Sequence, residues 1–374
     1  MKLLLTMAIS LFCCASASAE EAALPEIKSE GMTLKLERVA EGLQIPWGMS
    51  FISAQQLLVT EREGGVRLLD VTTGTYTAVK DAPEVLAEGQ GGMLDIAVSP
   101  DYAKDGWIYF TYVKDVDIDS QGATVLARAK LKDDSFRSLQ DLLVTKSATD
   151  TNYHFGSRIA FDDDGHVFFG IGDRGVRENG QDRSNHAGSI MRLNLDGSVP
   201  EDNPSAKDKP FLPEVWSIGV RNPQGLAFDK KHNRLWEIEH GPRGGDEINL
   251  IKAGANYGWP VISYGKEYWG PVAVGEGTHR EGMEQPVKQY TPSIAPGSLL
   301  FYSADTIPGW KGNLFSGALK LRHLNRVVLS EQGEVLQEER LLEELGERIR
   351  ALAQSPEGWL YFSTDNGNIY RIRP

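Results

Sequence analysis

Residues 155–173 have the sequence FGSRIAFDDDGHVFFGIGD, which contains the unit that predicts the fold of the whole chain. Two short runs rich in apolar and β-branched residues, SRIAF and HVFFGI, flank the turn-forming sequence DDDG. Asp and Gly favour tight turns, and short apolar runs bounded by such residues are typical of strands. The stretch therefore predicts a strand, a tight turn and a second, antiparallel strand.

Five further stretches repeat this pattern, each with Gly near an apolar pair and a turn of Asp, Pro or Gly. They are WGMSFISAQQLLVTE (47–61), GGMLDIAVSPDYAKDGWIYFTY (91–112), NPQGLAFDKKHNRLWEIEHG (222–241), PGSLLFYSADTIPGWKGNLFSGAL (296–319) and IRALAQSPEGWLYFSTDNGNIYRI (349–372). Their starts lie about 45 to 70 residues apart, which indicates repeats with one antiparallel sheet each. A sandwich or barrel does not explain so long a repeat. We therefore expect an all-β protein with a six-bladed β-propeller fold.

The segments outside these repeats fit the same fold. VLQEERLLEELGERIR (335–350) has the spacing of an amphipathic helix, but we expect a strand and a loop because a sheet is due there. Three polar stretches rich in Gly and Pro are expected to be long loops between the repeats: Glu178–Ser184, Pro200–Pro213 and Trp269–Gln285. No linker interrupts residues 20–374, which predicts a single propeller domain.

Residues 1–19 predict a secretory signal peptide. Lys2 precedes the apolar run LLLTMAISLFCC, and the small residues Ala17-Ser18-Ala19 form a cleavage site. The run is shorter than the roughly 20 apolar residues of a membrane span, so we expect no membrane anchor. Both cysteines lie in this leader, so the mature chain has none for a disulfide. These features predict a soluble protein that is secreted across the inner membrane to the periplasm.

The chain is acidic, with 39 Lys and Arg against 52 Asp and Glu and a net charge of −13, which becomes −14 when Lys2 leaves with the signal peptide. Such a charge opposes binding to nucleic acid or to an anionic membrane. Most of these charges are expected only to keep the protein in solution.

Four cations nevertheless gather at the ends of expected strands in the last two repeats. They are Lys320 and Arg322 in GALKLR and Arg348 and Arg350 in GERIRAL. Arg binds carboxylates through two parallel hydrogen bonds and Lys supplies a point charge, so the cluster suits a ligand with several carboxylates. Surface ion pairs with neighbours such as Glu347 are the alternative.

Three histidines are candidates for proton transfer. His154 lies in TNYHFGSR at a loop-to-strand junction, where a neutral imidazole can accept a proton near pH 7. His186 in SNHAG and His240 in EHGP are further candidates. A structural hydrogen bond is the alternative role for all three.

The sequence EHGPRGGDEINL (239–250) is rich in oxygen ligands. Its Gly241-Pro242 turn exposes backbone carbonyls, and Asp246 and Glu247 add carboxylates. Oxygen ligands suit calcium, and the lack of cysteine excludes a thiolate zinc site. A Gly-rich turn with solvated acids is the alternative, and Tyr257 in the following NYGWP can equally belong to the core.

Six motifs together resemble the soluble pyrroloquinoline quinone (PQQ)-dependent aldose sugar dehydrogenases, which are related to soluble glucose dehydrogenase. They are RNPQG (221–225), EHGPRGGDEINL (239–250), NYGWP (256–260), GQGGMLDIAVSPDY (89–102), HFGSRIAFDDDGHVFFGIGD (154–173) and GERIRAL (346–352). The resemblance runs from about Pro46 to the C-terminus. It implies a six-bladed propeller with the quinone over its axis, and an enzyme that oxidises the anomeric hydroxyl of aldose sugars to lactones.

The resemblance also implies roles for individual residues. The cofactor would be held by Gln90, Arg221, Asn222, Tyr268, Lys320, Arg322, Arg348 and Arg350. His154 would be the general base, Arg221 would polarise the quinone oxygens, and Asp173 would lie where the sugar approaches. Hydride would pass from the sugar carbon to the quinone while His154 takes the hydroxyl proton.

Calcium is the second cofactor that the resemblance implies. The carbonyls of Gly241 and Pro242 would hold one ion that also touches the quinone, and Glu247 with Tyr257 would bind a structural ion. Tyr153 and His240 stand where the glucose dehydrogenase branch has an acidic residue and Gln, which bears on sugar selectivity.

Two other functions compete with this interpretation. A calcium-dependent lactonase or hydrolase would need no quinone and would have little use for the cation cluster. A cofactor-free propeller that binds a partner is also compatible with the fold. For the dehydrogenase, the expected partners are an aldose sugar and an unidentified periplasmic electron acceptor.

Overall fold

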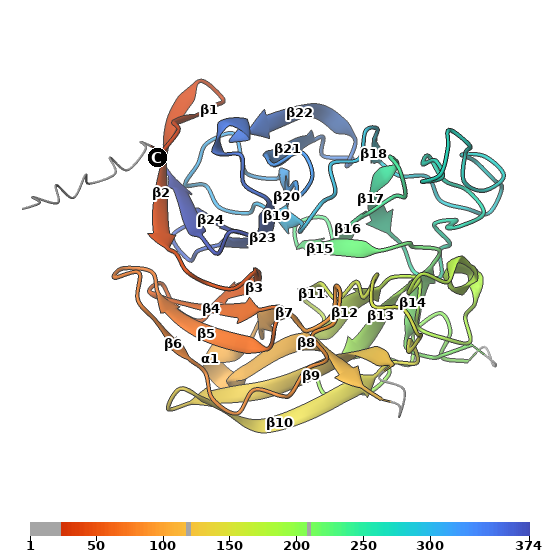
Figure 1. The fold of residues 1–374 in the computed structure, drawn as a ribbon, viewed down its shortest axis with the longest axis horizontal. Helices are drawn as coiled ribbons and strands as arrows, with labels where there is room; N and C mark the ends of the chain where they lie inside the picture. Colours follow the sequence, from red (N-terminus) through yellow and green to blue (C-terminus); the bar gives the residue numbers. More distant parts are fainter. Residues whose placement is uncertain (1–23, 117–120, 208–210) are drawn as a thin grey trace, which may run out of the picture.

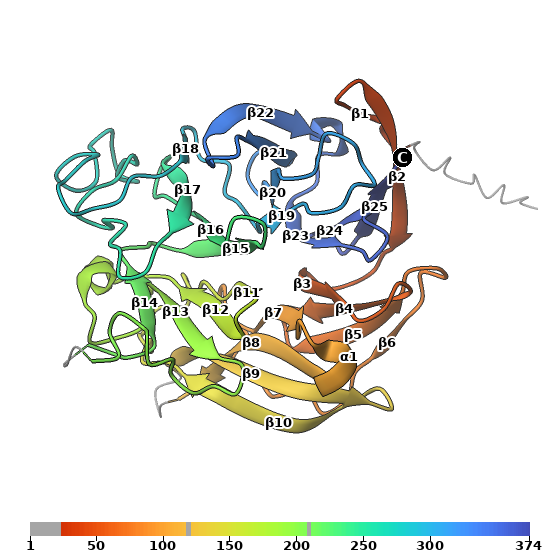
Figure 2. The same cartoon turned by 180° about the vertical axis from the view of Figure 1, so that it is seen from behind.

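The computed structural model describes residues 24–374 apart from 117–120 and 208–210, so the predicted signal peptide at 1–19 lies outside the described residues. The described chain forms six antiparallel sheets in a ring (Figure 1), and the same ring is seen from behind in Figure 2. Five sheets contain four strands each and the sixth contains five. This is the six-bladed β-propeller that the repeats predicted.

The first five sheets follow the chain in order. They comprise β3 (Pro46–Phe51), β4 (Gln56–Glu61), β5 (Gly65–Asp70) and β6 (Tyr76–Ala78); β7 (Met93–Val98), β8 (Trp107–Asp115), β9 (Gly122–Lys132) and β10 (Ser135–Val144); β11 (Ile159–Phe161), β12 (His166–Ile171), β13 (Ser189–Asn194) and β14 (Val215–Ile218); β15 (Pro223–Asp229), β16 (Arg234–Glu239), β17 (Asp246–Ile251) and β18 (Lys288–Tyr290); and β19 (Leu300–Phe301), β20 (Leu314–Gly317), β21 (Leu324–Leu329) and β22 (Val335–Leu341). The first strand of each is the innermost, and it falls within one of the six predicted repeats.

The sixth sheet joins the two ends of the described chain and closes the ring. It contains β23 (Ile349–Gln354), β24 (Leu360–Thr364) and β25 (Ile369–Arg373), followed by β2 (Met32–Ala40) and β1 (Ile27–Ser29). β2 pairs antiparallel with β25. Hydrogen bonds from Arg373 and Arg371 of β25 lower the pKa of Glu37 on β2 to about 2. Pairs between the chain ends therefore hold β2 and β25 together within the sixth sheet.

The inner strands come close together around the axis, which explains the Gly residues of the repeats. A Cβ on Gly48 would lie 2.8 Å from the Asp95 side chain, and one on Gly225 would lie 2.4 Å from the backbone nitrogen of Leu299. Apolar side chains fill the space between neighbouring sheets, where Leu58 of β4 and Phe110 of β8 are fully buried in one cluster. Burial of such side chains between sheets stabilises the ring.

The segment 335–350 confirms the expected strand and loop, because β22 is followed by a 3-10 turn, η2 (Glu343–Leu345). The other short helices are α1 (Tyr102–Asp105) and the 3-10 turn η1 (Arg177–Gln181). No helix in the described part of the chain is long and apolar enough to span a membrane.

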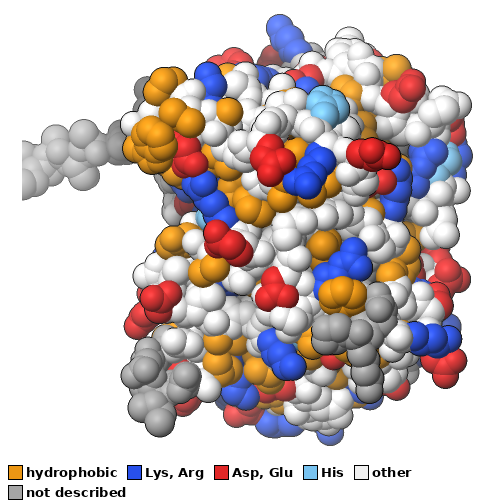
Figure 3. Space-filling view, turned by 90° about the vertical axis from the view of Figure 1, so that its right-hand side faces the viewer, with side chains coloured by type: hydrophobic (Ala, Val, Ile, Leu, Met, Phe, Trp, Pro, Cys, Tyr) orange, Lys and Arg blue, Asp and Glu red, His pale blue; other side chains and the backbone are white. Residues whose placement is uncertain are grey.

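The three predicted loops do not lie between the repeats as expected, because each connects strands within one sheet. Glu178–Ser184 lies between β12 and β13, Pro200–Pro213 between β13 and β14, and Trp269–Gln285 between β17 and β18. The third and fourth sheets therefore contain long internal connections. Figure 3 shows Lys, Arg, Asp and Glu side chains interspersed over the side of the ring that carries these sheets.

Candidate functional site

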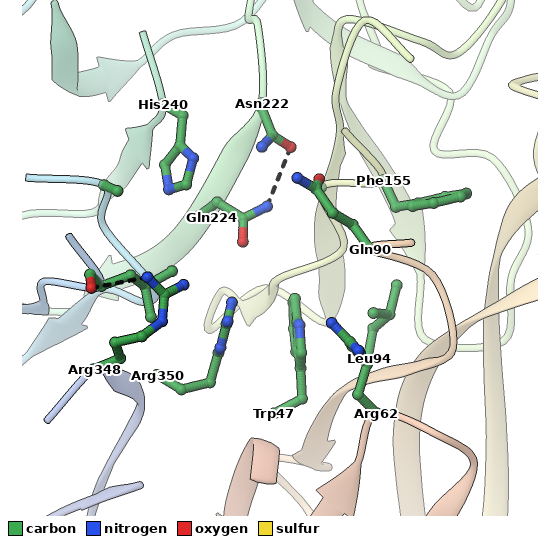
Figure 4. A pocket seen from close by; sticks show the side chains of 13 residues that line it. Trp47, Arg62, Gln90, Leu94, Phe155, Asn222, Gln224, His240, Arg348 and Arg350 are labelled. Atoms are coloured by element: carbon green, nitrogen blue, oxygen red, sulfur yellow. Dashed lines mark hydrogen bonds between the residues drawn. The ribbon is translucent and has the colours of Figure 1, made fainter. Parts of the chain in front are cut away.

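A cavity of about 200 Å³ lies on the axis of the ring, and all six sheets or their adjoining loops contribute to it (Figure 4). Its lining comprises Trp47, Arg62, Gln90, Leu94, Phe155, Gly156, Asn222, Gln224, His240, Ala295, Leu319, Arg348 and Arg350. In Figure 4, Trp47, Arg62 and Arg350 extend from one side toward Asn222 and His240 on the other. Three guanidinium groups and three amides therefore face one space, which suits an anion with hydrogen-bonding groups.

Two of the four predicted cations line this cavity, and a carboxylate that the sequence did not single out joins them. Arg348 Nε and Arg350 Nε each donate to Asp365 at 2.8 Å. Burial opposes ionisation of Asp365, but Arg350 and then Arg348 outweigh it and lower its pKa. The alternative partner Glu347 bonds to other groups, including Tyr370. Two positive charges therefore share one negative charge, and Arg62 adds a third cation.

The structure does not bring the other two predicted cations into the cavity. Lys320 and Arg322 are exposed and absent from its lining, and Arg322 donates to the backbone oxygen of Gly346 at 3.3 Å. Arg62, which does line the cavity, follows β4 in the sequence TEREGG. Nothing in that local sequence distinguishes Arg62 from an ordinary turn residue, so only the fold identifies it.

His154 lies beside the cavity, paired with Asp173. The two atoms His154 Nδ1 and Asp173 Oδ1 are 2.6 Å apart, and the His154 side chain is 13% exposed. A carboxylate only accepts hydrogen bonds, so the ring proton is assigned to Nδ1 and Nε2 keeps the lone pair. Nε2 has no hydrogen bond to any described residue. Backbone N–H of His154 donates to the cavity residue Gln90 at 2.9 Å.

Asp173 is buried in contact with His154. It is 1% exposed, and it accepts hydrogen bonds from Gly175 N at 2.8 Å and from Trp259 Nε1 at 2.7 Å as well as from His154. Burial opposes its ionisation, but the hydrogen bond and charge of His154, with Arg221, lower its pKa. Asp173 therefore orients the imidazole, and its Oδ2, which among the described residues accepts only from Trp259, keeps a second lone pair.

The pKa of His154 is lowered because burial disfavours the imidazolium and the charge of Arg221 repels it, while Asp173 opposes both effects. The base is therefore neutral at neutral pH, as proton abstraction requires. His154 has φ of 60° and Ser157 has φ of 96°, conformations that are uncommon for residues other than Gly. The intervening Gly156 is required, because a Cβ there would lie 2.5 Å from the oxygen of Gly170. Such strained backbone is frequent at functional sites.

The other two histidines play different parts. His186 is 2% exposed and accepts a hydrogen bond from Lys146 N at 2.9 Å, which is a structural role. His240 lines the cavity and donates from Nε2 to the oxygen of Pro296 at 2.6 Å. Burial lowers the pKa of His240 to about 3, so its ring is neutral. His240 therefore contributes a neutral ring to a cavity whose charged lining residues are the cations Arg62, Arg348 and Arg350.

The Gly241-Pro242 turn lies beside Arg221. Arg221 NH1 donates to the carbonyls of His240 and Gly241 at 2.9 Å each, and the Tyr268 hydroxyl donates to that of Pro242 at 2.9 Å. Both proposed calcium-binding carbonyls therefore already accept one hydrogen bond, and each keeps a second lone pair. Tyr268 is 66% exposed, so it lies at the rim. The buried Nε of Arg221 has no partner among the described residues, and Arg221 is absent from the lining of the axial cavity.

Buried carboxylates lie next to this turn. Glu237, Glu239 and Glu247 are at most 8% exposed. Burial and the repulsion of Glu239 raise the pKa of Glu237 and Glu247 well above the ordinary value, and burial raises that of Glu239 to about 7. Tyr257 is 4% exposed, and its hydroxyl donates to Leu250 O at 2.7 Å, so only its backbone carbonyl is available to a metal.

The donor groups fit one of the two implied cofactors better than the other. Guanidinium and amide groups around the cavity fit a planar ligand that carries several carboxylates. For calcium, uncompensated buried acids fit a cation. However, the described residues contain no group of three or more His, Cys, Asp or Glu placed to hold a metal ion. Calcium here would therefore need backbone carbonyls, water or the cofactor itself as additional ligands.

Comparisons with known proteins indicate the family to which the chain is similar. The family model described as Glucose / Sorbosone dehydrogenase matches residues 43–371. An aldose sugar dehydrogenase of Escherichia coli K12 is 37% identical over 354 residues, which cover 91% of this chain and 93% of that protein. The crystal structure of the soluble aldose sugar dehydrogenase from Escherichia coli in the apo-form has a TM-score of 0.87 at 34% identity and covers 91% of this chain and 100% of that one. The PQQ-bound aldose sugar dehydrogenase from Streptomyces coelicolor has a TM-score of 0.73 at 28% identity, with coverage of 91% and 98%.

Proposed function

The chain belongs to the glucose/sorbosone dehydrogenase family, and from this premise we propose that it uses PQQ to oxidise the C1 hydroxyl of aldose sugars to lactones. The observation that carries the proposal is the buried His154–Asp173 pair beside a cavity with three guanidinium groups. The reaction needs both a proton acceptor for the sugar and a binding site for a carboxylated cofactor. The two features lie together on the axis, joined by the hydrogen bond from His154 to Gln90.

His154 acts as the general base in this proposal. Its free Nε2 takes the proton from the anomeric hydroxyl, while Asp173 holds the Nδ1–H tautomer and stabilises the imidazolium that forms. Arg221 stabilises negative charge that develops on the electron acceptor. When bound, the quinone supplies the two-electron acceptor to which the C1 hydrogen passes as hydride.

The cofactor carboxylates would bind to Arg348, Arg350, Gln90 and Asn222, with Arg62 as an addition from the structure. Tyr268, Lys320 and Arg322 were also implied by the resemblance. They lie exposed outside the cavity lining, so we propose that they contribute at its rim.

Calcium would bind at two places. One ion would use the Gly241 and Pro242 carbonyls together with the cofactor, and the second would use Glu247 and the backbone carbonyl of Tyr257. The raised pKa of Glu247 supports the second site, because a bound cation would offset the cost of burying that carboxylate.

Sugar choice would depend on Tyr153 and His240, which flank the base and the cavity. The Tyr153 ring meets the His154 ring edge to face at 4.8 Å and is 39% exposed. We propose that the mature protein works in the periplasm, on the basis of the predicted leader at 1–19. There it would pass electrons to an acceptor that the sequence does not identify.

The decisive experiment measures aldose-dependent dye reduction by the purified mature protein, with and without added PQQ and calcium. We expect activity only when both are present, with the lactone as product. Full activity in a chelator without quinone would refute the proposal. Lactone hydrolysis without quinone would instead favour the calcium-dependent hydrolase, and failure to bind quinone or turn over either substrate would favour the binding module.

A further inference from the structure

One buried side chain, Arg158 of the third sheet's region, contacts residues of all five remaining sheets or their adjoining loops. It lies in the third repeat, next to the start of β11. Its guanidinium lies 3.9 Å from the Trp47 ring centroid, and it donates to Asp95 Oδ1 at 2.8 Å, Gln224 O at 3.1 Å, Gly297 O at 2.6 Å and Arg350 O at 3.2 Å. These five partners belong to the first, second, fourth, fifth and sixth sheets or their adjoining loops.

Arg158 lies between two cavities on the axis. Three of its partners, Trp47, Gln224 and Arg350, line the cavity of the candidate active site. Arg158 and Asp95 themselves line a second cavity of about 390 Å³, which is bounded mainly by apolar residues of the inner strands. Arg158 therefore lines the second cavity and contacts residues that line the first.

Burial of the Arg158–Asp95 ion pair costs free energy, so the pair is a poor way to stabilise the fold. Both residues are at most 7% exposed, and burial raises the pKa of Asp95 and lowers that of Arg158 despite their attraction. Buried ion pairs often give no more stability than apolar residues of similar volume. Asp95 is also fixed, because its Oδ2 accepts a hydrogen bond from Ile159 N at 2.9 Å. The geometry is therefore more readily explained by positioning than by stability.

We propose that Arg158 is a positioning residue for the cofactor cavity. Its guanidinium packs against the Trp47 ring, and its hydrogen bonds to the backbone oxygens of Gln224 and Arg350 fix the backbone that presents those two side chains. Arg158 also lies between this cavity and the second one. The proposal rests on the proposed function, because the ligand it positions for is the quinone. It requires that loss of Arg158 loosen the strand ends that carry Trp47, Gln224 and Arg350 even when no ligand is bound.

The test compares Arg158→Met with a matched control, Arg326→Met. Arg326 is 1% exposed and also joins separate parts of the chain, with hydrogen bonds to Glu339, Glu30 and Gly309 O. It is absent from the lining of both cavities. Any effect of losing a buried guanidinium as such should therefore appear in both variants.

Two readouts are needed: hydrogen exchange in the ligand-free protein and the PQQ dissociation constant. We expect Arg158→Met to speed exchange at the cavity ends of β3, β15 and β23 and to weaken PQQ binding at least tenfold. Arg158→Lys should recover part of the affinity, because it keeps the charge but not the planar fork. Arg326→Met should lower the melting temperature comparably and leave the dissociation constant within about twofold.

Each outcome decides between the two claims. Unchanged affinity in folded Arg158→Met, or equal losses in Arg326→Met, would overturn the positioning role. If Arg158→Met fails to fold, Arg158→Lys decides, and wild-type affinity together with wild-type exchange in that variant would overturn it. If the wild type binds no PQQ but Arg158→Met still loosens those strand ends selectively, the proposed cofactor fails while the axial positioning role stands.

Discussion

We expect Asp173→Asn to lower turnover by roughly 10² to 10⁴, close to the effect of losing the general base itself. The carboxylate holds the His154 proton on Nδ1, across 2.6 Å, and leaves Nε2 free. In either orientation the neutral amide no longer stabilises the imidazolium, and an amide nitrogen facing Nδ1 would also favour the opposite tautomer, with the proton on Nε2, which cannot accept a proton from the sugar. Asp173 also raises the pKa of His154, so the acidic limb of the residual pH–rate profile should move to lower pH.

The structure also sets the cost in stability. Three donors point at the two oxygens of Asp173: His154 Nδ1 and Gly175 N at Oδ1, and Trp259 Nε1 at Oδ2. An Asn has one oxygen, so in either orientation its amide nitrogen faces at least one of these donors. One buried donor is therefore left unsatisfied, which costs about 1 to 3 kcal/mol.

Asp162→Asn is the matched control, because the same blade offers a second His–Asp pair. Asp162 Oδ2 lies 2.7 Å from His166 Nδ1 at the opposite end of the β11–β12 hairpin. Steady-state rates and urea unfolding of both variants, with PQQ saturating, separate catalysis from stability. We expect similar losses of stability but wild-type turnover only in Asp162→Asn. Wild-type turnover in folded Asp173→Asn would refute the orienting role.

Three further predictions follow from the site. His154→Ala should lower turnover by roughly 10² to 10⁴ with nearly unchanged PQQ affinity, and a variant that loses affinity but keeps turnover at saturation would make His154 a cofactor ligand instead. Arg348→Ala should raise the PQQ dissociation constant about tenfold or more, and Lys320→Ala, outside the cavity, by less than about threefold; equal effects in a binding titration would contradict the cavity assignment. The pKa of Glu239 is raised from 4.5 to about 7, so calcium-free protein should lose stability as the pH rises through that window; a melting temperature that is flat with pH and unaffected by calcium would refute this.

The local sequence was sufficient to predict the fold. Each inner strand falls where an apolar run follows Gly and precedes a turn, and strand periodicity depends only on neighbours in the chain. The local sequence did not predict how the ring closes, because β2 pairs with β25 at the other end of the described chain. It also did not show that the long loops 178–184 and 269–285 lie inside sheets, since the third and fourth strands of a blade give weaker patterns.

The sequence by itself determined the propeller, the acidic charge and the presence of His154, Arg348 and Arg350 in recognisable motifs. Only the tertiary structure decided which of those residues meet. It placed Asp365 between the two arginines, paired Asp173 with His154, added Arg62 to the cavity and left Lys320 outside it. The physical reason is that a propeller site is built where loops from six sheets converge, so its contacts join residues separated by hundreds of positions. Spacing along the chain predicts a strand, whereas the charge balance around an axis depends on how the strands are packed.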